Sequence, residues 1–224
     1  MTVRPFEQLA CPLDGEPLHR KDNAWACPQG HSFDVARQGY VNLLPVQKKK
    51  SRDPGDSKAM VVARQAFLTA GFYQPIADAV ATALLDGAGA DTEKGADSDA
   101  GADSGIEPAL SCLDAGCGEG YYLRQLATHA QSHTSRSLEL LGLDISKWAV
   151  QSAARQDKNM AWVVGNNANL PVLPESLNRV FCMFGFPVYA EFQRVLKPGG
   201  RLIMAETGAD HLRELREIIY PVVK

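Results

Sequence analysis

The sequence of 224 residues has no apolar run long enough to cross a bilayer, and its first residues, MTVRPFEQLACPLDGEP, lack the apolar core of a signal peptide. Net charge is also small, because 23 Lys and Arg residues stand against 26 Asp and Glu residues, a balance of −3. We therefore expect a cytoplasmic protein with no membrane partner. With 45% hydrophobic residues the chain can bury a substantial core, and its length suggests one large domain plus a small one.

Cysteine is scarce as well, at five residues, and the count is odd. Cys112, Cys117 and Cys182 lie in apolar strands or at their exits. In a reducing compartment such residues are most simply small core side chains. This leaves Cys11 and Cys27 for chemistry.

The most informative stretch that is present is LSCLDAGCGEGYY, residues 110–122. Its apolar residues predict a buried strand, and Gly116, Gly118 and Gly120 then fall at every second position before a predicted helix. Such a turn permits positive φ and lets a ligand approach the main chain closely, while the helix N-terminus offers free N–H groups. The stretch is therefore predicted to cradle a small molecule.

The glycine spacing separates this turn from dinucleotide sites, which use G-x-G-x-x-G. Here the pattern is G-x-G-x-G, with Asp114 just before it and Glu119 within it. A carboxylate in the turn would repel a pyrophosphate but suits an ammonium or sulfonium group. Asp144 ends a second apolar strand, where its carboxylate can accept ribose hydroxyls. The pair resembles the S-adenosylmethionine site of class I methyltransferases, although any turn between a strand and a helix can look like part of it.

Beyond residue 106, predicted strands alternate with predicted helices. Strands are expected near residues 110–115, 138–143, 160–164, 179–184 and 201–205, and helices near 121–129 and 146–156. This order predicts an α/β fold, a mostly parallel Rossmann-like sheet with helices on both faces. Upstream, residues 57–85 predict two helices separated at Gly71. Tyr73 lies between them and is a candidate either to close over a bound cofactor or to pack between domains.

Two short knuckles near the N-terminus have the spacing of a zinc site. Cys11 and Asp14 form the first, and Cys27 and His31 form the second. Each knuckle bends the chain enough to aim two ligands at one point. Asp14 stands where a cysteine is expected, and its harder oxygen ligand should weaken the site. The alternative is that both cysteines are merely buried and His31 is a surface residue.

A basic cluster follows at Lys48, Lys49, Lys50 and Arg52. Such a segment can track the phosphate backbone of a nucleic acid, or it can be an ordinary solvated loop. Residues 87–105, GAGADTEKGADSDAGADSG, are small, acidic and almost free of bulky apolar side chains. We expect them to form a disordered surface insertion.

Several segments add to these motifs: Cys11-Pro12, Cys27-Pro28, GYVNLLPVQ from Gly39, SRDPGD from Ser51, ARQAFL, GFYQP and LDAGCGEGYY. Together they resemble the bacterial 23S rRNA guanine-N1 methyltransferase family over nearly the whole chain. The resemblance implies an N-terminal zinc domain that binds RNA and a class I methyltransferase domain that uses S-adenosylmethionine. Its target would be a guanine in the hairpin 35 region of 23S rRNA. The implied zinc ligands are Cys11, Asp14, Cys27 and His31, with Asp14 replacing a cysteine.

The loops that follow the third and fourth strands complete the expected site. Asn166 or Asn167 is expected to hydrogen-bond the adenine edge, unless this segment is a simple turn. Phe186 lies where the substrate should sit, in a Gly-Phe-Pro-Val segment that departs from the Ala-Pro-Cys-like turn of the family, and it either stacks on a base or packs. The resemblance places His211 near the cofactor, although it can also be an ordinary helix-face histidine. The expected cofactor-binding set is Tyr73, Asp114, Gly116, Gly118, Glu119, Gly120, Tyr121, Tyr122, Asp144, Asn166, Asn167 and His211.

The general base is not identified; Asp53 and Asp56 are the nearest guesses, and a turn role suits both. These features divide the chain into a zinc-binding RNA-recognition domain (1–45), a basic loop and helical linker (46–86), the acidic insertion (87–105) and a methyltransferase domain (106–224). The last domain is expected to lack its final strands, and the exposed edge could then pair with a second chain in a homodimer. Two other functions stay open: methyl transfer to a small molecule, and a non-enzymatic module that binds zinc and RNA.

Overall fold

The computed structural model describes residues 1–45, 51, 53–87 and 108–220. Its centre is a seven-stranded sheet in the order β10-β9-β6-β7-β8-β5, with β1 paired to β7 beside this path. The strands are β1 (Val3–Pro5), β5 (Val41–Asn42), β6 (Leu110–Ala115), β7 (Leu138–Asp144), β8 (Ala161–Val164), β9 (Leu177–Met183) and β10 (Leu196–Ala205). They pair in parallel, which confirms the predicted Rossmann-like sheet.

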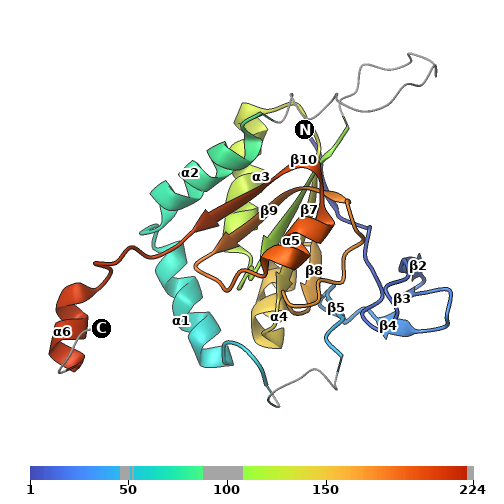
Figure 1. Ribbon diagram of the computed structural model, residues 1–224, viewed down its shortest axis with the longest axis horizontal. Helices are drawn as coiled ribbons and strands as arrows, with labels where there is room; N and C mark the ends of the chain where they lie inside the picture. The colour runs from blue at the N-terminus through green and yellow to red at the C-terminus, as the bar shows by residue number, and fades with distance from the viewer. Residues whose placement is uncertain (46–50, 52, 88–107, 221–224) are drawn as a thin grey trace.

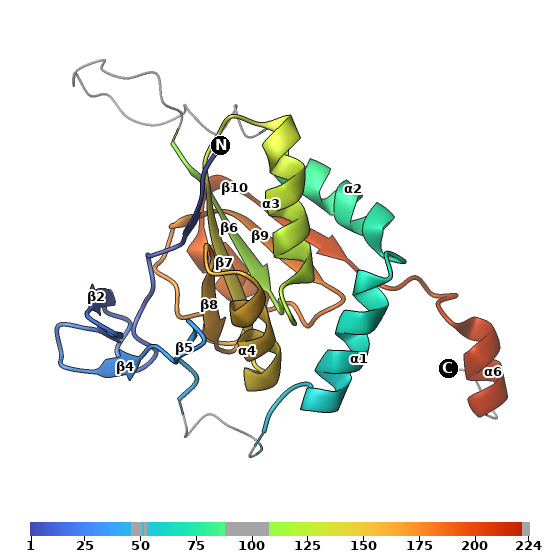
Figure 2. The ribbon, with the colours of Figure 1, turned by 180° about the vertical axis from the view of Figure 1, so that it is seen from behind.

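Helices cover both faces of this sheet (Figures 1 and 2). One face carries α1 (Lys58–Thr69), α2 (Gln74–Leu85), α3 (Tyr121–His133) and α4 (Lys147–Gln156), and the other carries α5 (Tyr189–Val195). Successive strand residues point to opposite faces. Accordingly, Cys112 of β6 packs in the cluster with α2 and α3, and Leu113 packs in the cluster with α5. A strand that is apolar throughout is what a sheet covered on both sides requires.

The N-terminal segment completes the second face. It contains a separate antiparallel sheet of β2 (His19–Lys21), β3 (Ala24–Ala26) and β4 (Ser32–Asp34). Phe6, Leu9 and Trp25 from this segment share one buried cluster with Leu113 of β6 and Phe192 of α5. The N-terminal segment is therefore part of the core of the large sheet.

Two strands of the large sheet, β1 and β5, were not expected from the sequence, because three and two residues carry too little periodicity to be recognised. Val3 of β1 lies opposite Leu138 of β7, and Val41 of β5 lies opposite Val163 of β8. The chain thus enters the large sheet before the small antiparallel sheet and again after it.

The position of the Trp162 indole explains why residues 120 and 142 are glycines. It lies so close to Gly120 and Gly142 that a Cβ at either position would overlap the ring. The indole N–H donates a hydrogen bond to the backbone oxygen of Asp157 at 2.9 Å, which fixes the ring. Gly120, the third glycine of the turn, therefore allows the Trp162 indole to pack closely beneath the loop.

After β10 the chain leads into α6 (Arg213–Ile219), which lies apart from the rest of the described molecule and buries none of its residues (Figures 1 and 2). Within the described residues, β10 pairs with β9 and has no strand on its other side. That a second chain pairs with this edge stays a prediction. No helix in the described ranges combines the length and apolarity needed to cross a membrane.

Candidate functional site

The glycine turn connects β6 to α3 at the carboxyl end of the sheet, where parallel α/β sheets place their ligands. Gly116, Gly118 and Gly120 have φ values of +106°, +55° and +83°, which residues with a Cβ rarely adopt. A Cβ at Gly116 would meet nothing within 4 Å. The turn therefore borders open space with bare main chain.

Asp114 lies at the end of β6, directly behind this turn. It is fully buried, and neither of its carboxyl oxygens has a hydrogen-bond partner. Burial, together with the nearby Asp144 carboxylate, raises the pKa of Asp114 well above its usual value. An unsatisfied buried polar group costs roughly 1–3 kcal/mol, a cost that a hydrogen-bond donor reaching this carboxyl group would remove.

Asp144 ends β7 next to the turn. Its Oδ2 accepts a hydrogen bond from the N–H of Gly118 at 2.9 Å, and its Oδ1 accepts one from Ser146 at 2.7 Å. Burial raises the pKa of Asp144, and these two hydrogen bonds oppose that shift. Ser146 also caps α4, because its hydroxyl oxygen accepts a hydrogen bond from Ala149 N–H at 3.3 Å. The helix predicted near residues 146–156 is confirmed, with Ser146 as its N-cap.

Among the described residues of the SRDPGD segment, Gly55 and Asp56 form a further wall of the site. The hydroxyl of Ser146 donates to the backbone oxygen of Asp56 at 2.7 Å, and the Asp56 carboxylate pairs with Arg64 of α1 at 3.1 Å. Gly55 has φ +82°, and a Cβ there would come within 2.9 Å of Ile145 and Ser146. The segment therefore lies directly against the loop that holds Asp144.

Two cavities meet at the glycine turn and share Arg64, Gly116, Met183 and Phe184 in their walls. The first has a volume of about 290 Å³ and is also lined by Tyr73, Tyr121, Tyr122, Glu119, Gly118 and His211. The second has a volume of about 350 Å³ and is also lined by Asp56, Asp144, Asn166, Asn167 and Phe186. The structure thus brings most of the expected cofactor residues to one elongated cleft.

Aromatic side chains line the first cavity. The ring of Tyr73 lies 5.1 Å from that of Phe67 on α1 and 5.8 Å from that of Phe184, between ring centroids. Tyr121 donates its hydroxyl to Gln74 at 3.3 Å, and the buried hydroxyl of Tyr122 has no partner. Tyr73 lines this cavity, and its closing over a bound cofactor stays a prediction. Phe184 and Arg64 were not singled out there.

Glu119 differs from its expected role. Its carboxylate is 1% exposed, pairs with Arg124 at 2.7 Å and accepts a hydrogen bond from Gln156 at 2.7 Å. The charge is therefore balanced inside the protein, and attraction of a cationic ligand does not fit this pairing. Glu119 instead ties the glycine turn to α3 and α4.

The two asparagines after β8 have different roles. Asn166 Oδ1 accepts a hydrogen bond from Ala168 N–H at 3.0 Å, which closes a local turn. Asn167 Nδ2 donates to the backbone oxygens of Ala115 and Phe186 at 3.3 Å each, while its buried Oδ1 has no partner. Asn167 therefore joins the end of β6 to the loop that carries Phe186.

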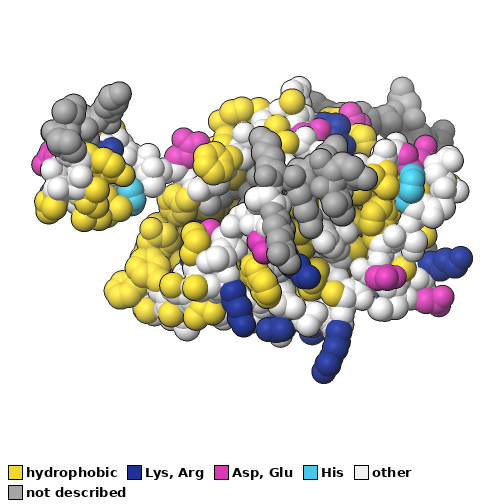
Figure 3. Space-filling model, turned by 90° about the horizontal axis from the view of Figure 1, so that it is seen from below, with side chains coloured by type: hydrophobic (Ala, Val, Ile, Leu, Met, Phe, Trp, Pro, Cys, Tyr) yellow, Lys and Arg dark blue, Asp and Glu magenta, His cyan; other side chains and the backbone are white. Residues whose placement is uncertain are grey.

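That loop forms part of an exposed apolar surface beside the cleft. The exposed fraction of Phe186 is 91%, against 41% for Phe184 and 62% for Tyr189. In Figure 3 hydrophobic side chains gather between α6, which is the detached lobe at the left, and the middle of the face. The packing role considered for Phe186 does not fit so exposed a ring.

The proposed zinc ligands converge. One ligand atom from each of Cys11, Asp14, Cys27 and His31 lies within 4.8 Å of all the others. Asp14 Oδ2 is 2.8 Å from His31 Nδ1 and 3.2 Å from Cys27 Sγ. Tetrahedral zinc with bonds of about 2.0–2.3 Å separates its ligand atoms by roughly 3.3–3.8 Å, so small adjustments accommodate the ion.

Local turns explain this convergence. Gly15 N–H bonds to Cys11 O at 2.9 Å and Gly30 N–H bonds to Cys27 O at 3.0 Å, and both glycines have positive φ. Although burial acts in the opposite direction, the Glu16 N–H and the neighbouring thiols and imidazole hold the pKa of Asp14 below its usual range. Asp14 is thus ionised and ready to bind a cation.

The basic cluster Lys48, Lys49, Lys50 and Arg52 lies outside the described residues, and so do residues 88–105 of the expected acidic insertion. RNA binding by the cluster and disorder of the insertion stay predictions.

Two family models match the chain. The RlmA N-terminal zinc ribbon matches residues 9–52, and a methyltransferase domain matches residues 112–200. A 23S rRNA (guanine(748)-N(1))-methyltransferase of Streptomyces fradiae is 34% identical over 92% of this chain and 66% of its own length. A Micromonospora griseorubida protein, provisionally named a 23S rRNA (guanine-N(1)-)-methyltransferase, is 36% identical over 92% of this chain and 68% of its own length. This chain belongs to the 23S rRNA (guanine-N(1)-)-methyltransferase family.

The chain spans about two thirds of the length of these two relatives. A solved structure from Methanococcus maripaludis, provisionally described as an S-adenosyl-L-methionine-dependent methyltransferase, is 18% identical, covers 77% of each chain and gives a TM-score of 0.51. Such a likeness shows the fold. The large sheet is therefore that of an S-adenosylmethionine-dependent methyltransferase, and the N-terminal segment is a zinc ribbon with a Cys/Asp/His cluster.

Proposed function

We propose that this protein transfers a methyl group from S-adenosylmethionine to N1 of a guanine in 23S rRNA, in the hairpin 35 region that its motifs imply. The observation that carries the proposal is the combination of the zinc ribbon and the methyltransferase cleft in one core, in a chain related over 92% of its length to named 23S rRNA methyltransferases. An rRNA substrate places this activity in the cytoplasm.

The cleft fits S-adenosylmethionine, which supplies an electrophilic methyl group when bound. Asp144 offers carboxylate oxygens at the carboxyl end of β7 for ribose hydroxyls. The positive-φ backbone at Gly116 and Gly118 lets the ligand lie against the turn. Behind the turn, Asp114 supplies a buried carboxyl group without a hydrogen-bond partner, and Tyr73 lines the first cavity beside Phe67. We also assign to this site Gly120, Tyr121, Tyr122, Asn166, Asn167 and His211. Glu119 supports the glycine turn through Arg124 and Gln156.

The target guanine is placed by Phe186. This ring is 91% exposed and borders the cavity that contains Asp144. Asn167 and Pro187 hold the backbone of its loop in place. Proteins that read unpaired RNA commonly stack its bases on aromatic side chains. Holding base and cofactor together provides most of the acceleration that a methyl displacement needs.

Guanine N1 carries a proton that must leave during transfer. Asp56 was one guess for the base, but its carboxylate is paired with Arg64 at 3.1 Å. This pairing suits a role in holding α1 against the cleft. We therefore assign no residue as the base.

The test supplies radiolabelled S-adenosylmethionine and 23S rRNA that lacks the modification, and identifies N1-methylguanosine in the digested RNA by mass spectrometry. We expect label in RNA. The Phe186→Ala variant should lower kcat/KM for RNA by roughly tenfold, the effect of losing one stacked base, with unchanged affinity for S-adenosylmethionine. The matched control is Val62→Ala, which removes an exposed apolar side chain from α1.

Three results would reject the proposal in different ways. Binding of S-adenosylmethionine without transfer to any RNA would favour a small-molecule substrate. RNA binding without affinity for S-adenosylmethionine would indicate a non-enzymatic module. Methylation at a guanine atom other than N1 would support an rRNA methyltransferase but would reject N1 as the acceptor atom.

A further inference from the structure

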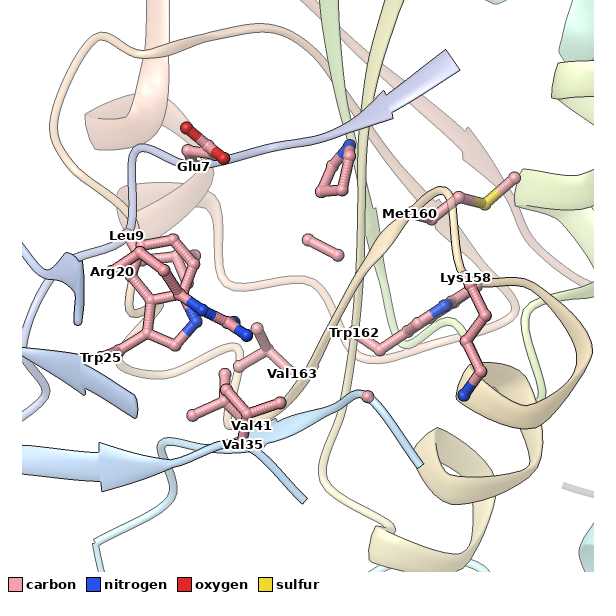
Figure 4. A pocket seen from close by; sticks show the side chains of 13 residues that line it. Glu7, Leu9, Arg20, Trp25, Val35, Val41, Lys158, Met160, Trp162 and Val163 are labelled. Carbon is pink, nitrogen blue, oxygen red and sulfur yellow. The ribbon is translucent and has the colours of Figure 1, made fainter. Parts of the chain in front are cut away.

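A separate cavity of about 340 Å³ lies between the zinc ribbon and the edge of the large sheet, away from the glycine turn (Figure 4). We call it the ribbon cavity, and Leu9, Arg20, Trp25, Lys158 and Trp162 are among its walls. Its volume lies within the roughly 300–1,000 Å³ range of small-ligand sites. No part of the methyltransferase mechanism uses it.

The topology of the sheet produces this cavity. β1 pairs with β7 up to Pro5, opposite Leu140, and β8 takes over beside β7 at Ala161. β5 then pairs with β8 at Val163 and Val164. Among the described strands, none pairs with β8 at Ala161 on the side that faces the cavity. A short strand edge therefore borders the cavity with main-chain donors and acceptors.

An aromatic and cationic pair forms the opposite wall. Trp25 of β3 is 8% exposed, and the guanidinium carbon of Arg20 on β2 lies 5.8 Å from the centre of its ring. Arg20 Nε donates to Asp22 O at 3.2 Å, which holds the guanidinium in this position. Figure 4 shows both side chains in the same wall of the cavity as Leu9. Planar groups of this kind are surfaces on which unpaired bases stack.

A second cation comes from the other side of the cavity. Lys158, after α4, donates from Nζ to the backbone oxygen of Gln38, and Figure 4 shows its side chain across the cavity from Arg20. Glu7 is the one acidic residue among the described residues that line the cavity. The cavity thus has an excess of positive charge in a chain whose formal charge is −3.

We propose that the ribbon cavity binds one unpaired nucleotide of the RNA substrate, at a distance from the target guanine. The base packs beside the Arg20–Trp25 pair with its polar edge toward β8 at Ala161. The phosphate lies between Arg20 and Lys158. This inference rests on the proposed function, because a nucleotide of RNA and a free ribonucleotide offer the same chemistry and the family relation favours RNA.

Binding is tested directly with five-nucleotide RNAs, pentaadenylate and pentauridylate, and with AMP and UMP. The readout is the NMR signal of the Trp25 indole N–H, assigned by its loss in Trp25→Phe. We expect a five-nucleotide RNA to shift this signal. The Arg20→Ala/Lys158→Ala double variant should weaken binding roughly tenfold and lower the slope of log affinity against log salt by about 0.7 for each phosphate that is no longer neutralised.

The matched control is the Lys21→Ala/Arg155→Ala double variant. Lys21 follows Arg20 on β2, Arg155 lies on α4 near Lys158, and neither lines the cavity. This control removes the same charge and should leave both the Trp25 signal and RNA affinity within about twofold. In the methyltransferase assay, the Arg20→Ala/Lys158→Ala variant should raise KM for RNA, with kcat and affinity for S-adenosylmethionine unchanged.

Equal loss of RNA affinity in the control and cavity variants would overturn the inference, since it would show a non-specific effect of charge. An unshifted Trp25 signal would overturn it as well. Tighter binding of AMP or UMP than of either five-nucleotide RNA would assign the cavity to a free nucleotide and reject the RNA ligand. Methyl transfer to RNA that continues in the cavity variants without a change in KM would reject the inference while the proposed function stands.

Discussion

The carboxylate of Asp144 holds the backbone of Gly118, with Oδ2 at 2.9 Å from its nitrogen. The end of one parallel strand thus fixes the turn that follows its neighbour. Since Asp144 also accepts a hydrogen bond from Ser146 N–H at 2.7 Å, one side chain sets the shape of two loops at the cleft.

Replacing Asp144 with Asn should weaken affinity for S-adenosylmethionine by at least roughly tenfold, because one acceptor oxygen becomes a donor beside two backbone donors. Isothermal titration calorimetry measures this. The control is Glu139→Gln on the same strand, whose side chain pairs with Arg4 at 2.9 Å outside the cleft. Equal affinities of the Asp144→Asn variant and the unmodified protein would contradict a role in holding the cofactor.

Gly55→Ala should impair cofactor binding more than backbone strain explains. A Cβ at Gly55 would lie 2.9 Å from Ile145 and Ser146, whereas a Cβ at Gly71 would meet nothing within 4 Å. The φ values are +82° and +84°, so Gly71→Ala imposes the same strain, about 1–2 kcal/mol, without the collision. Thermal unfolding and calorimetry on both variants separate the two effects. Identical behaviour would show that the SRDPGD segment does not shape the cleft.

Asp114 should make the free protein less stable as pH rises. Its folded pKa is raised above the unfolded value of about 3.9, so between these values the folded state binds more protons than the unfolded state. The stabilisation is complete below the unfolded pKa and is lost as pH rises toward the folded pKa. The Asp114→Asn variant has no titrating carboxyl group at this position, so this loss of stability should be absent from it.

The midpoint of thermal unfolding, measured without S-adenosylmethionine at pH 5 and pH 8, should therefore fall less in the Asp114→Asn variant than in the unmodified protein. Each kcal/mol corresponds to about 2–4 °C in a chain of this size. Parallel curves for the two proteins would show that Asp114 is not the titrating group.

Asp14 should set the strength of the zinc site. Asp14→Cys supplies a third thiolate and should slow the removal of zinc by a chelator, whereas Asp14→Ala should speed it, each by roughly tenfold. Release is followed with a chromogenic zinc indicator. Glu16→Gln is the control, because its exposed side chain neighbours the site without being one of the four converging residues. Equal release rates for all variants would exclude Asp14 as a ligand.

Local patterns in the sequence predicted much of this arrangement. The glycine turn, the order of the strands from β6 onward and the four converging residues of the zinc ribbon each depend on neighbours in sequence. The role of Glu119 could not be predicted, because its partner Gln156 belongs to a different helix. The position of Gly55 against Ser146 likewise depends on tertiary packing. The exposure of Phe186 required the structure, because an apolar residue after a strand is equally compatible with packing.

The pairing of β1 with β7 has a consequence for the order in which the chain folds. Val3 precedes the zinc ribbon in the chain, whereas its partner Leu138 comes only after both the zinc ribbon and α3. Contacts of such long range form late, since the intervening chain must first be closed into a loop. During synthesis the apolar side of the zinc ribbon therefore stays exposed until β7 and β8 have been made. Early zinc binding would keep the ribbon folded and protect it from aggregation in that interval.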